Sequence, residues 1–164
     1  MKRWISLYVE NQVGVLAKIS GLFSGKAYNM TSLTVGETED QTVSRMTIGL
    51  DSDDATFELI KKQLNRCIEV IKVIDFTAKP IRQKEILYIK VSTHDEKERT
   101  ELFRMSEVFG FQIVDYGKKA LLLECVQTEK KNDEIIELIS GYFKDIEVVR
   151  GGSVAIEAVS IPKK

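Results

Sequence analysis

The sequence contains few of the residues on which catalytic and metal centres are commonly built. Its 164 residues include two cysteines, Cys67 and Cys125, and one histidine, His94. The cysteines lie far apart in apolar segments without a CxxC spacing, so we expect two buried free thiols rather than a disulfide. His94 lies in the polar run HDEKER and is expected at the surface near a helix start. No metal site and no histidine-based catalytic centre are therefore expected.

An excess of one charge and long apolar runs are also missing. The 24 Lys and Arg residues nearly match the 25 Asp and Glu residues, so no global field favours nucleic acid or an acidic membrane. No stretch approaches the roughly 18 apolar residues of a membrane span, and no N-terminal run reaches signal-peptide length. Neither GxGxxG nor GxxxxGK[ST] occurs, which disfavours nucleotide binding. We expect a cytoplasmic protein with no nucleic-acid or membrane partner.

The hydrophobic pattern predicts a compact unit in the first half of the chain. Ile5, Leu7 and Val9 alternate with other residues as in a half-buried strand, and from Val15 the apolar spacing becomes helical until Gly25. A second helix, capped by Asp53 or Asp54, is expected to bury one apolar face. The strands of this unit are predicted at residues 4–10, 29–35, 43–50 and 70–76, and the face of the second helix at Phe57, Ile60, Leu64 and Cys67.

The second half repeats the same order after a short segment, TAKPIRQK, that has the composition of a linker. Its predicted strands are residues 86–91, 111–116, 120–126 and 146–150, followed after a Gly151-Gly152 break by a strand at 154–159. One predicted helix covers Thr100–Phe109 with Leu102, Phe103, Ser106 and Phe109 on its stripe, and the other carries Ile135, Ile136, Ile139 and Phe143.

The pattern therefore predicts an α+β fold made of two ferredoxin-like βαββαβ domains. The expected boundaries are residues 1–77 for the first domain, 78–84 for the linker and 85–164 for the second domain. Each antiparallel sheet is expected to carry helices on one face and to leave its other face partly open. Open faces and edges of this size favour dimerisation.

A turn between the first strand and the first helix suits a small anion. The first amides of a helix lack intrahelical partners, and the helix dipole adds positive potential there. Gly14 allows close approach, and Asn11 offers both a donor and an acceptor, so together they suit an α-amino acid. The simpler interpretation is that Asn11 caps the helix and Gly14 eases the turn. The residues of the turn, taken alone, are compatible with both interpretations.

Longer runs around this turn resemble the small regulatory subunits of acetolactate synthase, also called acetohydroxyacid synthase, whose first half is an ACT domain. The resemblance rests on ENQVGVLAKISGLFSGKAYNMTSLTVG, SRMTIGL and KKQLNRCIEVIKV in the first half, in the expected order and spacing. EVFGFQIVDYG and EVVRGGSVAI resemble the C-terminal domain of the family. The similarity covers nearly the full length, although Ala27 occupies a position where the family usually has glycine.

The resemblance implies a regulatory partner with no catalytic residues of its own. Its large partner subunit, which holds thiamine diphosphate, Mg and FAD, condenses two pyruvates, or pyruvate with 2-ketobutyrate, to start branched-chain amino acid synthesis. The small subunit raises the activity of that enzyme and confers feedback inhibition by valine. No cofactor is expected in this chain, and a homodimer through ACT domains is implied.

The resemblance also implies a valine site shared between two ACT domains. Its residues are expected from the turn of one protomer and from the second strand of the other. They are Asn11, Gly14, Val15, Leu16, Asn29, Met30 and Gly36. Val13 and Gly36 differ from the usual residues of the family, so the preferred branched-chain amino acid is left open.

Two other functions compete with this interpretation. The first is a stand-alone ACT-type transcription regulator that responds to amino acids, but the chain has no helix-turn-helix or basic segment to bind DNA. The second is a small ferredoxin-like enzyme. Its carboxylates cluster in solvated runs such as ETED, DSDD and HDEKE, without a paired nucleophile and base.

Overall fold

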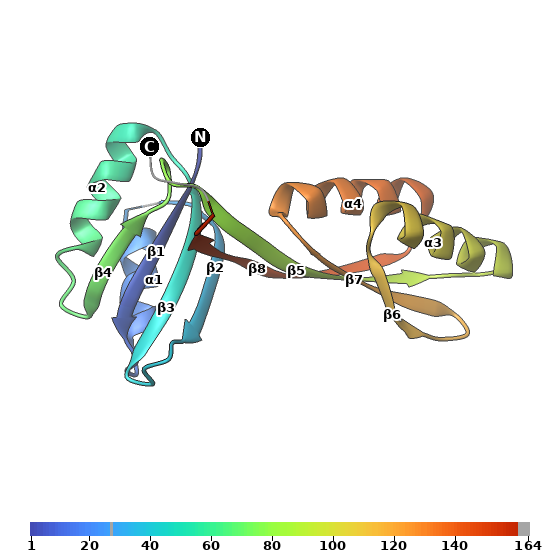
Figure 1. Ribbon diagram of the computed structural model, residues 1–164, viewed down its shortest axis with the longest axis horizontal. Coiled ribbons are helices and arrows are strands. Elements are labelled where there is room, and N and C mark those ends of the chain that lie inside the picture. Colours follow the sequence, from blue (N-terminus) through green and yellow to red (C-terminus); the bar gives the residue numbers. More distant parts are fainter. Residues whose placement is uncertain (27, 161–164) are drawn as a thin grey trace. The chain divides into compact units, whose positions relative to one another are not determined.

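The computed structural model describes residues 1–26 and 28–160, which form two compact units. The first unit combines residues 1–82 with the segment that starts at Ser153, and the second comprises residues 83–152. Each unit is built on a four-stranded sheet with two helices on one face (Figure 1). The predicted pair of ferredoxin-like βαββαβ folds is confirmed. Ala27 lies outside the described residues.

The first unit follows the order that the hydrophobic pattern predicts. Its strands occur in the order β2-β3-β1-β4, so β2 and β4 form the two edges. The elements are β1 (Lys2–Glu10), α1 (Val15–Ser24), β2 (Met30–Glu37), β3 (Val43–Asp51), α2 (Asp54–Leu64) and β4 (Val70–Asp75).

Alternation in the strands and helical spacing in α1 and α2 build one core. Because strand side chains alternate between faces, Ile5, Leu7 and Val9 of β1 all point toward the helices and are fully buried. The matching helix residues recur every three or four positions. They are Val15, Ile19 and Phe23 of α1 and Phe57, Ile60 and Leu64 of α2.

The second unit repeats this arrangement with the strand order β6-β7-β5-β8. Its core joins β5 and β7 to the inner faces of the helices. The core includes Leu87, Ile89, Val91, Leu102, Leu121, Leu123, Ile135 and Ile139. The elements are β5 (Ile81–Ser92), α3 (Glu96–Phe109), β6 (Gln112–Tyr116), β7 (Ala120–Gln127), α4 (Glu129–Tyr142) and β8 (Ile146–Glu157).

Helix α3 differs from its prediction in both start and face. It begins at Glu96 because the Asp95 side chain accepts a hydrogen bond from the amide of Glu98 at 2.8 Å and caps the helix. Its buried residues are Leu102 and Met105. Phe103, predicted in the buried stripe, is 45% exposed, and its ring lies 6.1 Å from that of Tyr116. Ser106 is half-buried, and its hydroxyl donates to the carbonyl of Phe103.

The predicted break at Gly151-Gly152 is wrong, because β8 continues through both glycines. Gly152 has a φ of 78°, and a Cβ on Gly151 would lie 2.6 Å from Cγ2 of Ile86. The glycines therefore serve a left-handed backbone position and a close strand approach rather than a strand end. Strand β5 begins at Ile81, inside the segment predicted as a linker.

The open face of the first sheet is partly covered by the end of β8. We refer to Ser153–Glu157, which belongs to the first unit, as the C-terminal strap. The Ser153 carbonyl accepts from Thr34 Oγ1 at 3.0 Å, and its amide donates to Ser32 Oγ at 3.0 Å. Arg45 Nη2 donates to the carbonyl of Ala155 at 3.2 Å. The face that the pattern predicts as open is thus partly closed by the chain itself.

Both cysteines are free, as predicted. Cys125 is buried in the core of the second unit, and burial raises the pKa of its thiol to about 11. Cys67 is half-buried just after α2, where burial also raises its thiol pKa. Both thiols are therefore protonated at neutral pH and poorly nucleophilic.

Candidate functional site

The turn before α1 exposes helix amides without a side-chain cap. Gly14 is the N-cap residue of α1, with a φ of 90°, and no side chain donates or accepts at this cap. A Cβ at Gly14 would meet no atom within 4 Å, so its left-handed backbone rather than lack of space favours glycine. The Val15 side chain is buried in the core, whereas Leu16 is half exposed. The amide of Val15 donates to the carbonyl of Gln12 at 3.3 Å, so an anion at this turn would bind the amides that follow it.

Asn11 does not cap α1, so the simpler interpretation of this residue is wrong. Its Nδ2 donates to the carbonyl of Gln41 at 2.9 Å and to Glu37 Oε1 at 3.1 Å. Its Oδ1 accepts from Ser44 Oγ at 3.0 Å. Asn11 therefore ties the turn to the loop between β2 and β3.

Three of the residues around Asn11 could not be identified from the sequence, namely Glu37, Gln41 and Ser44. These partners lie 26 to 33 positions away along the chain, where no local pattern marks them. An ion pair between Lys18 of α1 and Glu69, just before β4, was also missed. Its hydrogen bond raises the pKa of Lys18 and lowers that of Glu69. Long-range polar contacts thus tie α1 to the start of β4 and the turn before α1 to the β2–β3 loop.

The structure brings only some of the predicted ligand residues together in one chain. Gly36 pairs with Arg45, which also pairs with Tyr8, so Gly36 lies at the end of the sheet near the turn. Met30 pairs with Leu50, opposite Arg3 at the start of β1. Because β2 has eight residues, Met30 and the preceding Asn29 lie about 20 Å from its other end. The predicted site is therefore incomplete within one chain.

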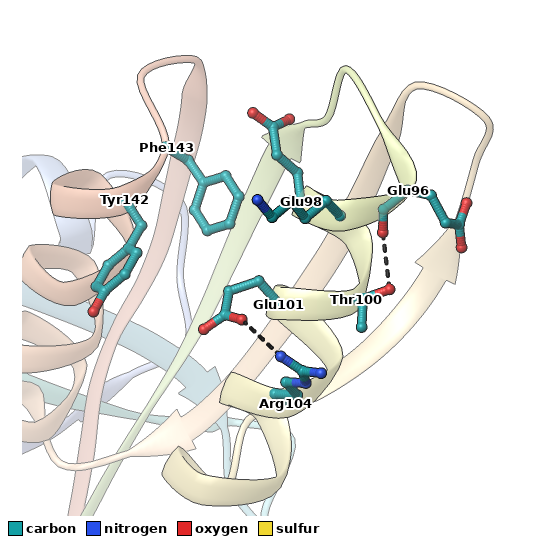
Figure 2. Close-up of a pocket in the computed structure, with 8 residues that line it drawn as sticks. Glu96, Glu98, Thr100, Glu101, Arg104, Tyr142 and Phe143 are labelled. Atoms are coloured by element: carbon teal, nitrogen blue, oxygen red, sulfur yellow. Dashed lines mark hydrogen bonds and ion pairs between the residues drawn. The ribbon is translucent and has the colours of Figure 1, made fainter.

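A second cleft lies in the second unit, between the start of α3 and the end of α4 (Figure 2). It measures about 550 Å³, and Phe143 and Tyr142 line it opposite charged side chains of α3. Several of those polar groups are already paired within or next to α3. Glu101 faces Arg104 at 3.6 Å, Thr100 Oγ1 donates to the carbonyl of Glu96, and Glu98 accepts from the amide of His94. This cleft therefore offers few unpaired groups to a ligand.

The described residues form no metal centre. Among them, no group of three His, Cys, Asp or Glu side chains is arranged to hold a metal ion. His94 is exposed, as predicted, with Nδ1 3.3 Å from Glu98. None of the described helices combines the length and apolar character needed to cross a membrane.

Comparisons with known proteins match both halves of the chain. Residues 5–72 match the AHAS small subunit-like ACT domain family, and residues 84–159 match the family described as small subunit of acetolactate synthase. The acetolactate synthase small subunit of Aquifex aeolicus is 39% identical over 94% of this chain and 80% of its own length. The isozyme 3 small subunit of Escherichia coli is 35% identical over 95% of each chain.

A solved structure extends this similarity to the fold. The crystal structure of the acetolactate synthase small subunit from Thermotoga maritima superposes with a TM-score of 0.87 at 30% identity. The alignment covers 98% of this chain and 99% of that one. With a family match in each half and relatives that span almost its whole length, the chain belongs to the acetolactate synthase small subunit family, with an ACT domain in its first half.

Proposed function

We propose that this chain is a cytoplasmic regulatory subunit that activates an acetolactate synthase large subunit and confers feedback inhibition by valine. The observation that carries the proposal is the uncapped turn at Gly14, within a chain of this family and near the edge strand β2. The amide of Leu16 would bind the valine carboxylate, since that of Val15 donates to the carbonyl of Gln12 at 3.3 Å. The half-exposed Leu16 side chain would contact the apolar side chain.

The missing part of the site would come from a second copy of the chain. Asn29 is exposed and Met30 half-buried at the far end of β2, so neither can reach the turn of its own chain. A two-fold arrangement would bring Asn29 and Met30 of the partner to this turn, where the side-chain oxygen of Asn29 would accept from the ligand ammonium. Gly36, without a side chain, would leave room beside the ligand. An ACT homodimer would therefore hold two equivalent sites.

The chemistry would reside in the large subunit. That subunit would hold thiamine diphosphate, Mg and FAD and condense pyruvate with a second pyruvate or with 2-ketobutyrate. In this chain the prominent polar side chains at the turn, such as Asn11 and Lys18, are engaged in structural contacts. The role of the small subunit would be to change the activity of its partner through binding.

Thermal unfolding of the purified chain with and without valine tests the ligand. Binding to the folded state stabilises it by about 2.7 kcal/mol when valine is at one hundred times its dissociation constant. Sedimentation of the same sample tests the dimer. Assays of the large subunit, alone and with this chain, test activation and inhibition. No thermal shift with valine, leucine or isoleucine, together with no effect on the large subunit, would refute the proposal.

A further inference from the structure

A cleft lies on the face of the first sheet that points away from α1 and α2. The valine site proposed at the turn does not use its residues. Tyr8 follows the buried Leu7 and precedes the buried Val9, so its side chain points away from α1 and α2. It lines a cleft of about 330 Å³, near the lower end of the range for small-molecule sites. The other lining residues are Thr38, Glu39, Asp40, Val43, Ile71 and Lys72.

Two cations flank Tyr8 without an acidic partner. Arg45 and Lys72 are the direct neighbours of Tyr8 on β3 and β4, so all three side chains share one face. The guanidinium carbon of Arg45 lies 5.2 Å from the centre of the Tyr8 ring. Its Nε donates to Ser6 Oγ at 2.9 Å and its Nη2 to the strap. In the described part of the chain, neither Arg45 nor Lys72 forms an ion pair with a carboxylate.

Two carboxylates line the same cleft from the β2–β3 loop. Asp40 Oδ1 accepts from the amide of Thr42 at 2.9 Å and from its hydroxyl at 2.7 Å, which fixes the carboxyl group. These hydrogen bonds also lower the pKa of Asp40, so it is ionised at neutral pH. Glu39 has no ion-pair partner among the described residues. Glu39 and Asp40 would repel a ligand that carries only a negative charge, and Lys72 would repel a ligand that carries only a positive charge.

Apolar surface completes the cleft. Val43 and the Tyr8 ring are half-buried, and Ile71 is exposed, so the three can contact a short apolar side chain. A ligand that carries one negative charge, one positive charge and a small apolar group matches all of these features. An α-amino acid with a short aliphatic side chain has this composition.

We propose that the Tyr8 cleft is a second amino-acid site, separate from the turn at Gly14. Lys72 binds the carboxylate, Glu39 and Asp40 bind the ammonium group, and Val43 and Ile71 contact the side chain. The two sites share one loop. Asn11 binds the carbonyl of Gln41 on the turn side, while Thr38 to Asp40 line the cleft.

Backbone amide NMR of the full-length chain, titrated with L-valine, tests this inference. We expect saturable shifts at Tyr8, Val43 and Lys72 in the wild type and in Gly14→Asp, which blocks the turn. Leu16→Asp serves as a second turn variant should Gly14→Asp not fold. Lys72→Met should weaken the cleft response by about tenfold, because it removes one charged hydrogen bond. Lys62→Met, an exposed lysine on α2, should leave the response unchanged.

Analogues separate the zwitterion from simpler ligands. Isovalerate is valine without the ammonium group and isobutylamine is valine without the carboxylate, so neither should give a saturable shift at millimolar concentration. An equal response to isovalerate, a cleft response insensitive to Lys72→Met, or no response in both turn variants would overturn the inference. These results concern Tyr8, Val43 and Lys72, whereas failure of the turn site would appear at Val15 and Leu16.

Discussion

At the scale of single residues, Gly14 has a left-handed backbone that favours glycine, and it lies next to the first amides of α1. Gly14→Asp would place a carboxylate beside the position that we assign to that of valine. Two such charges about 4 Å apart near a protein surface repel by about 4 kcal/mol. We expect the valine concentration for half-inhibition to rise by about a hundredfold or more, while activation of the large subunit is retained. Enzyme assays with the reconstituted complex measure both.

The control for this substitution is Gly141→Asp. Gly141 lies in α4, and a Cβ there would also meet no atom within 4 Å. Gly141→Asp should leave inhibition by valine and activation of the large subunit unchanged. Normal inhibition of the Gly14→Asp complex would show that valine acts elsewhere. The backbone strain of a non-glycine residue at this φ costs about 1–3 kcal/mol, so unfolding of the variant must be measured alongside.

Asn11 should matter more for the order of a loop than for helix capping. Asn11→Ala removes contacts with Glu37, Gln41 and Ser44. We expect amide hydrogen exchange of residues 38–42 to accelerate and the free energy of unfolding to fall by about 1–2 kcal/mol. Asn65→Ala, which removes a contact with the carbonyl of Lys61, is the control. Unchanged exchange in the loop would mean that other contacts hold it.

At the scale of secondary-structure elements, the start of α2 depends on Asp53. Its carboxylate accepts from the amide of Thr56 at 2.7 Å, and this hydrogen bond lowers the pKa of Asp53. A lowered folded-state pKa adds stability above the unfolded value of about 3.9, and this stability is lost as the pH falls through the folded pKa.

Chemical denaturation as a function of pH checks this effect. We expect the stability difference between the wild type and Asp53→Asn to be present at pH 6 and to shrink as the pH falls below about 4. Asparagine remains a competent cap, so the comparison isolates the charge. A difference for Asp53→Asn that stays constant down to pH 2 would contradict the assignment.

A buried polar network joins β5, α4 and β8 in the second unit. Glu85 is 4% exposed, and its carboxylate accepts from Arg150 Nε at 3.0 Å and Nη2 at 2.8 Å. Asn132 Nδ2 donates to the same carboxylate at 3.0 Å, and Asp133 accepts from Arg150 Nη1 at 2.7 Å. The network links residues far apart in sequence through one buried charge.

Removal of one partner should be worse than removal of both. We expect Arg150→Met to destabilise the protein by about 3 kcal/mol, because it leaves the Glu85 carboxylate buried without its cation. The double variant Glu85→Met/Arg150→Met should recover part of this loss. Arg104→Met, whose partner Glu101 lies near the surface, should have little effect. Equal losses in the single and double variants would argue against the charge effect. Denaturant titration provides the free energies.

The order of elements could be predicted because it depends on local periodicity. The alternation around Leu7 and the helical spacing from Val15 both have short-range causes. The start of α3 was misplaced because Asp95 lies in a charged run that resembles a solvated surface. The partners of Asn11 and the contacts of the strap could not be predicted, because hydrogen bonds between distant positions leave no local pattern. The turn at Gly14 could be located from sequence, whereas the role of Asn11 required the structure.

At the scale of the whole molecule, the strap gives the first unit a cover that comes from the end of the chain. Arg45→Met removes its hydrogen bonds to Ala155 and Ser6. A hydrogen bond to a charged donor contributes about 1.5–3 kcal/mol, so exchange of the strap amides should accelerate by about tenfold or more. Mass spectrometry of hydrogen exchange measures this. Arg66→Met, at an exposed position just after α2, should have no such effect.

The continuity of β5 and β8 has a consequence for how the chain can be divided. The first unit is interrupted after Arg82 and resumes at Ser153, so the second unit is inserted into the first rather than appended to it. The amide of Ala158 donates to the carbonyl of Pro80 at 2.9 Å. The segment that leads into the second unit and the segment that follows it therefore lie side by side. A short turn that replaces the whole insertion should therefore yield a self-contained first unit. A cut after Arg82 would instead leave Ser32, Thr34 and Arg45 without their cover.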